Sequence, residues 1–128
     1  MGQQQLLLIV LGTIIVGVAV IVGINMFTKA AVNAEQDALL NDINHVAYLA
    51  APYWHKPASM GGGNRSFLGI TDVTAFGADM TNLNGTLVVS NVTGNQFTLT
   101  ATGATEGVII VATITQQGVS GNPTITLP

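Results

Sequence analysis

The chain begins with "MGQQQLLLIVLGTIIVGVAVIVGINMF", residues 1–27, and the apolar run within this stretch determines what the rest of the fold must accommodate. The segment from Leu6 to Ile24 contains no charged residue and no proline. At about 1.5 Å of rise per residue, a helix of this length reaches roughly 28 Å, close to the hydrocarbon thickness of a bilayer. We therefore predict an N-terminal helix that lies in lipid or in an equally dry protein environment.

Two ordinary interpretations of this segment fit its flanks poorly. A secretory signal peptide, with "VNA" before Glu35 as the cleavage site, needs a basic start and an apolar run of roughly 7–15 residues. A single-pass anchor normally shows Lys or Arg on its cytoplasmic side. The flank before the apolar run is glutamine, at Gln3, Gln4 and Gln5, and the first charged residue is Lys29.

A third interpretation explains the missing charges, because a basic leader that once preceded Met1 would be removed after membrane insertion. On this pattern, residues 1–55 resemble the N-terminus of a type IV pilin. Pilins have a cleaved basic leader, a charge-poor helix that first anchors in the membrane, and a continuation into a globular domain. The resemblance implies that Met1 is the processed and N-methylated first residue, which mass spectrometry of the purified protein tests.

One position departs from the family pattern, which usually has a glutamate at the fifth mature residue. The fifth residue here is Gln5, which can hydrogen-bond a neighbouring subunit's terminal amine but cannot form an ion pair. Cleavage between Gly2 and Gln3 would place Leu7 there, but it would leave a leader with no basic residue. The alternative role for the glutamines is a polar cap on the helix.

After Lys29 the apolar pattern narrows to a single helical face. Pro52 predicts the end of this helix, and the glycines 61–63 predict a flexible turn. We predict one helix over residues 1–50, apolar on all sides over 1–27 and amphipathic over 28–50, then a loop over 51–66. The residues that form the stripe are Val32, Leu39, Ile43, Val46 and Ala50, at steps of seven, four, three and four.

Residues 67–128 read as an antiparallel β-domain. "GTLVVSNV", "NQFTLTAT", "GVIIVATIT" and "PTITL" are rich in β-branched residues and are separated by turn signals. Phe97, Leu99 and Ala101 alternate with threonines, so one face of that strand is apolar and the other carries hydroxyl groups. The apolar face needs the helical stripe as its partner. The predicted fold class is α+β, a long N-terminal helix packed on a small C-terminal antiparallel sheet.

Composition excludes several classes of function. Charged residues make up 7% of the 128 residues, and the net charge is −3. The three cations are scattered along the sequence, so they predict no basic patch that could bind nucleic acid. The chain has no cysteine, which excludes disulfides and thiolate metal sites. His45 and His55 lie too far apart in sequence to read as a ligand pair, and no acid–base pair is evident. We expect no enzyme activity, no metal and no cofactor.

The pilin resemblance implies a structural function: the major subunit of an extracellular type IV pilus-like filament on the cell surface. Its partners would be other copies of itself, the inner (cytoplasmic) membrane before assembly, and the pilus assembly machinery. Adhesion, motility and DNA uptake are all roles of the family. Two alternatives stay open, namely a pseudopilin of a secretion system and a monomeric membrane-anchored extracellular binding module.

Small residues within the apolar segment allow close packing of helices. Glycine also weakens a helix by roughly 1 kcal/mol relative to alanine, so any unwinding on assembly is expected between Gly12 and Gly23. Gly12, Gly17 and Gly23 are therefore candidate packing or melting positions, and Thr13 is the side chain able to bond a freed backbone group there.

Three sequons, at Asn64, Asn84 and Asn91, are candidate N-glycosylation sites. Each has serine or threonine two residues later and no proline between. A fourth asparagine, Asn122, is excluded by Pro123.

Overall fold

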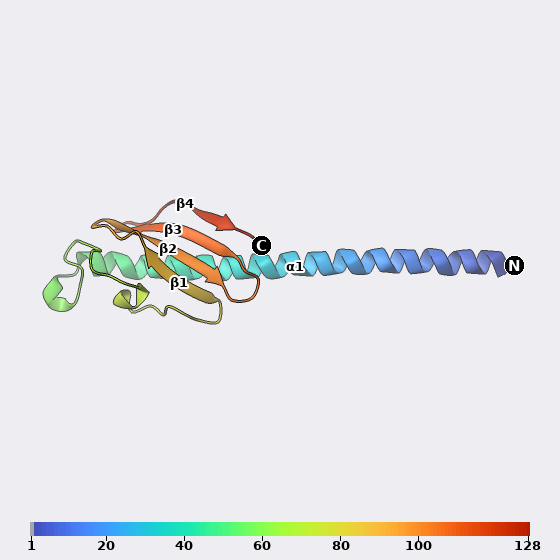
Figure 1. Cartoon of the computed structure of the whole chain (residues 1–128), viewed down its shortest axis with the longest axis horizontal. Coiled ribbons are helices and arrows are strands. Elements are labelled where there is room, and N and C mark those ends of the chain that lie inside the picture. Colours follow the sequence, from blue (N-terminus) through green and yellow to red (C-terminus); the bar gives the residue numbers. More distant parts are fainter. Residues whose placement is uncertain (1) are drawn as a thin grey trace. The chain divides into compact units, whose positions relative to one another are not determined.

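A computed structural model describes residues 2–128, and its first element is helix α1, Gly2–His55 (Figure 1). The chain divides into two compact units, residues 1–33 and residues 34–128. The first unit, so far as it is described, is the N-terminal part of α1. The second contains the rest of α1 and the whole of the sheet.

The sheet has four strands, β1 (Gly85–Ser90), β2 (Gln96–Gly103), β3 (Ile109–Thr115) and β4 (Gly118–Thr126). They pair antiparallel in the order β1-β2-β3-β4, so every connection is a short hairpin between neighbours (Figure 1). The C-terminal part of α1 packs on this sheet. The predicted α+β class is confirmed.

The strand register separates apolar from hydroxyl-bearing side chains. Phe97 pairs with Ile114, and Leu99 pairs with Ala112, so these buried side chains share one face of the sheet. The threonines between them lie on the opposite face, which is half-buried. The apolar face packs against the predicted stripe of α1, of which Val32 belongs to the other unit. The buried residues of α1 are Leu39, Ile43, Val46, Ala47 and Ala50.

Helix α1 extends further than predicted, because it continues through Pro52 to His55. Proline has no N–H, so the carbonyl of Tyr48 loses its usual helical donor. The loss is tolerated because Tyr48 is exposed and Pro52 lies in the last turn, so few helical bonds follow it. Proline at this position therefore does not stop the helix.

Each of the four predicted strand segments overlaps one strand, and the first strand begins at Gly85, so residues 67–84 of the predicted β-domain precede the sheet. The intervening segment contains a short 3-10 helix, Val73–Phe76, that buries Val73 and Phe76. Its sequence, "TDVTAFGADMTN", lacks the strict alternation of the true strands. The segment therefore contributes individual side chains to the core and adds no strand to the sheet.

The glycine-rich loop after α1 is packed against the helix end, which corrects the prediction of a flexible turn. Gly63 N–H donates to the Tyr53 carbonyl at 2.8 Å, and Asn64 N–H donates to the Lys56 carbonyl at 2.9 Å. A Cβ on Gly62 would lie 2.3 Å from the Lys56 Cβ. Glycine is required because the loop approaches the helix end closely enough to supply donors for its free carbonyls.

Four aromatic rings close the core near the end of α1. The ring of Tyr53 meets Phe76 edge to face at 4.9 Å, and Phe76 stacks on Phe97 at 5.4 Å. The ring centroid of Phe67 lies 5.1 Å from that of Phe97, again edge to face. Trp54 Nε1 donates to the Gly94 carbonyl at 3.0 Å, which attaches the last turn of α1 to the β1–β2 hairpin.

Two carboxylates of α1 bond the loops at the opposite end of the sheet. Glu35 accepts the backbone N–H groups of Thr105 and Glu106, each at 2.9 Å. Asp42 Oδ2 accepts from the side-chain amides of Asn82, at 3.0 Å, and Asn84, at 3.2 Å. The helix is thus bonded to the loops that precede β1 and β3.

We predict that Glu35→Ala lowers the free energy of unfolding by about 1–3 kcal/mol, because the two N–H groups lose a charged acceptor. Chemical denaturation of the detergent-solubilised chain, followed by near-ultraviolet circular dichroism, measures the change. Asp37→Ala is the matched control, because Asp37 is an exposed acid on the same helix. Equal stability of the two variants would contradict the anchoring role of Glu35.

Candidate functional site

The N-terminal part of α1 exposes a long series of large apolar side chains. Between Leu6 and Phe27 their exposed fractions run from 49% at Val22 to 78% at Phe27. This segment is long and apolar enough to cross a membrane, judged by length and composition. Apolar surface of this extent marks a site for lipid or for another protein.

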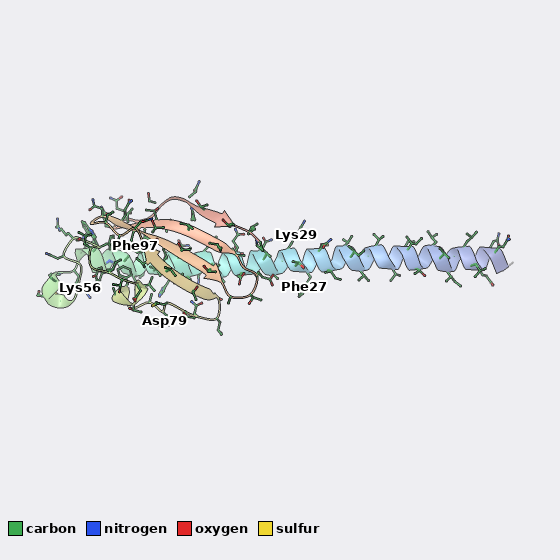
Figure 2. The ribbon with its side chains drawn as sticks, viewed as in Figure 1. Phe27, Lys29, Lys56, Asp79 and Phe97 are labelled. Carbon is green, nitrogen blue, oxygen red and sulfur yellow. The ribbon has the colours of Figure 1, made fainter. Side chains whose placement is uncertain are left out.

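The exposed apolar surface surrounds the helix. Figure 2 shows the side chains of this segment projecting on both sides of the ribbon as far as Phe27 and Lys29. The hydroxyl of Thr13 donates to the Ile9 carbonyl at 2.9 Å, and that of Thr28 to the Ile24 carbonyl at 3.0 Å. Both donors are satisfied within the helix. A helix that is apolar all round is stable only where it is surrounded by lipid or by protein.

Three glycines interrupt this apolar surface, and none of them is needed for a close contact among the described residues. They are Gly12, Gly17 and Gly23. A Cβ built on each of them meets no atom within 4 Å. At 3.6 residues per turn, Gly12, Ala19 and Gly23 fall on one face of the helix, whereas Gly17 falls on another. The small side chains therefore leave room for close approach of other helices from more than one direction.

The helix is continuous across residues 10–25, including Gly12, Thr13, Gly17 and Gly23. That any melting upon assembly falls between Gly12 and Gly23 stays a prediction, and an intact helix is the alternative. Gln5 is exposed on the first turns of α1, where its side chain is free to meet a partner, and its contact with another subunit is likewise untested. Met1, the predicted processing and methylation site, lies outside the described residues.

The structure distinguishes the three sequon asparagines. Asn64 and Asn91 are exposed and adopt left-handed backbone conformations, with φ of 53° and 50°. Asn84 is half-buried, and its amide nitrogen already donates to Asp42. Asn64 and Asn91 therefore present the more accessible side chains.

None of the titratable side chains of residues 2–128 belongs to a metal-binding cluster. His45 and His55 are both exposed, and among residues 2–128 no cluster of His, Asp or Glu could hold a metal ion. The hydroxyl and the N–H of Thr74 donate to Asp72 and hold the pKa of that carboxyl below its usual range. Asp72 caps the 3-10 helix that follows it, so this perturbed acid has a structural explanation.

Comparisons with protein-family models, with curated proteins and with solved structures find no match. The pilin resemblance therefore rests on the sequence pattern alone. The feature that calls for a functional explanation is the exposed apolar part of α1.

We predict that a fragment comprising residues 29–128 is soluble without detergent and keeps the near-ultraviolet circular dichroism of the full chain. The reason is that residues 34–128 hold their own core, while the continuous apolar surface lies before residue 28. Sedimentation and circular dichroism measure the outcome, with the full chain in detergent as the control. Aggregation of a folded fragment would show that a second large adhesive surface lies in the β-domain.

Proposed function

We propose that the chain is the structural subunit, or major pilin, of an extracellular type IV pilus-like filament that assembles through its apolar N-terminal helix. The observation that carries the proposal is the exposure of every large apolar side chain from Leu6 to Phe27 on an unbroken helix. Such a surface needs a dry environment before and after assembly. Lipid provides it before assembly, and neighbouring helices replace the lipid in the filament core.

The distribution of small residues supports packing of each helix against several others. Gly12, Ala19 and Gly23 share one face, and Gly17 lies on a different one. Without a hydrophobic driving force between helices in lipid, close backbone approach at small residues favours association. A helix at the centre of a bundle needs such residues on more than one face, whereas a solitary anchor does not.

The β4 edge of the sheet is poorly suited to an alternative mode of assembly, in which a strand of another chain pairs with it. Strand β4 is an edge strand that contains Pro123, which has no N–H to donate. It also contains Gly121 with φ of 65°, and its register with β3 shifts between Val111 and Thr113. These features protect an edge from pairing with another chain. At the β4 edge, assembly through α1 is therefore favoured over extension of the sheet.

Electron microscopy of material sheared from cells tests the proposal. We expect helical filaments, with this chain identified in them by mass spectrometry. Short assemblies confined to the cell envelope would favour the pseudopilin alternative. Chain that stays in the membrane as a monomer would favour the membrane-anchored binding module and would overturn the filament proposal.

We predict that Gly17→Leu impairs filament assembly much more than membrane insertion. The new side chain meets nothing within its own chain, and leucine raises helix propensity, so the isolated subunit should be unharmed. In a packed bundle the same side chain would hold neighbouring helices apart. Cell fractionation should find normal amounts of membrane-held subunit and at least a tenfold loss of sheared filament.

The matched control for this experiment is Val16→Leu. Val16 is exposed on the adjacent position of the same helix and is already large. Its replacement changes volume by one methylene group and removes no small residue. Normal filament yield from Gly17→Leu would contradict close helix packing at this glycine.

A further inference from the structure

Leu83 is the most exposed large apolar residue of the β-domain, with 99% of its surface accessible. It lies in the Leu83 turn, residues 82–85, which leads into β1 at Gly85. Asn82 Oδ1 accepts the N–H groups of Asn84 at 2.8 Å and Gly85 at 3.1 Å. Asp42 accepts from both asparagine side chains, so the turn is bonded to α1 as well as to itself. The side chain is held outward and has no route into its own core.

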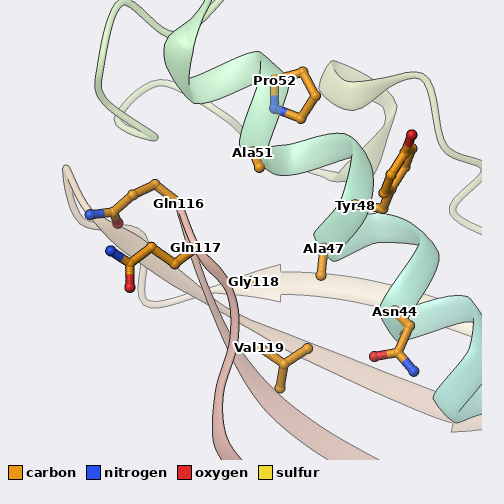
Figure 3. A pocket seen from close by; sticks show the side chains of 9 residues that line it. All are labelled: Asn44, Ala47, Tyr48, Ala51, Pro52, Gln116, Gln117, Gly118 and Val119. Atoms are coloured by element: carbon orange, nitrogen blue, oxygen red, sulfur yellow. The ribbon is translucent and has the colours of Figure 1, made fainter.

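A groove lies between the last turns of α1 and the β3–β4 hairpin (Figure 3). We call it the α1–β4 groove. Ala47, Ala51 and Val119 supply an apolar lining, while Asn44, Gln116 and Gln117 supply polar groups around it. Its volume of about 540 Å³ exceeds what a leucine side chain and its flanking backbone need.

The Leu83 turn and the groove occupy opposite corners of the β-domain. The turn precedes β1, at the end of the sheet where Gly85 pairs with Gly103. The groove includes the β3–β4 hairpin, at the end where Gln96 pairs with Thr115. Strands β1 and β4 are also the two opposite edges of the sheet. One copy therefore cannot fill its own groove, but two copies placed head to tail can make the contact.

Charge favours the same arrangement. The two cations of residues 34–128 are Lys56, which directly follows the end of α1, and Arg65, in the loop packed on that helix end. Asp79 and Asp42 lie with Asn82 around one hollow beside the Leu83 turn. Figure 2 shows Lys56 and Asp79 at separate places along this domain. A head-to-tail contact brings the basic end of one copy toward the acidic end of the next.

We propose that Leu83 of one copy docks in the α1–β4 groove of a second copy, forming the contact between β-domains in the filament wall. This inference rests on the proposed filament and names a contact that the α1 bundle alone does not define. The two surfaces are different, so the contact is heterologous, and it forms an open helical polymer when the rotation between copies does not close a ring. Such a contact suits an open helical polymer.

The first test compares filaments of Leu83→Ser with those of Leu83→Met and of wild type. Leu83→Ser removes the free energy gained by burying a leucine side chain in the contact. The fraction of dissociated subunit at a fixed detergent concentration should therefore rise about tenfold or more. Leu83→Met keeps the apolar side chain and should match wild type. Leu68→Ser is the control for an exposed leucine elsewhere in the β-domain. Wild-type resistance of Leu83→Ser filaments would overturn the proposal.

The second test uses the absence of cysteine from the chain. Leu83→Cys is combined with Gln117→Cys, and sheared filaments are treated with a short bis-maleimide. A heterologous contact should yield a ladder of covalent multimers, whereas either single variant should remain monomeric. Filaments that form but give no ladder would overturn the Leu83 contact and leave the filament proposal standing. Absence of filaments from wild-type cells would overturn both.

Discussion

Water solvates the surface of residues 6–27 poorly on every side of the helix, and this constraint governs the rest of the molecule. Each large aliphatic side chain gains about 1.5–3 kcal/mol when it is removed from water. The helix itself satisfies its backbone groups, and Thr13 and Thr28 bond to the carbonyls one turn before them. Among the described residues, none of the large apolar side chains from Leu6 to Phe27 is buried. The covering material must come from lipid or from other chains.

The second unit solves the opposite problem, because it must be stable where water is present. All of its buried residues are apolar, apart from Gly85. They come from α1, from the loop over residues 67–78, from the sheet and from Val108 just before β3. Polar bonds hold these elements together at the margins of the core. Glu35 and Asp42 bond the loops at one end, and the glycine-rich loop bonds the carbonyls of α1 at the other. A small domain without disulfides is thereby fastened at both ends of its helix.

The two units also offer two different kinds of surface. The apolar part of α1 offers strong but indiscriminate burial, because leucine and valine fit lipid as well as they fit other helices. The β-domain offers fewer apolar groups in defined places, with Leu83 on a bonded turn as the clearest case. In the proposed filament the helices supply most of the burial, and contacts between β-domains determine how successive copies are placed.

Local pattern in the sequence was sufficient for the helix, the buried stripe Leu39 to Ala50 and the antiparallel pairing, because each depends on periodicity or on hairpins between neighbours. It was also sufficient to single out the apolar segment as the candidate site, since composition alone defines it.

The sequence pattern failed where the outcome depends on residues or helix ends that are brought together only by folding. Pro52 is tolerated because of its place in the last turn, and the glycines 61–63 are ordered by the helix end that they approach. Glu35 and Thr105 are separated by 70 positions, and Asp42 and Asn82 by 40, so no local pattern reports that they meet. Only the folded chain brings them together. The exposed position of Leu83 follows from the bonds of Asp42 to its turn, and the groove forms where the last turns of α1 pass the β3–β4 hairpin.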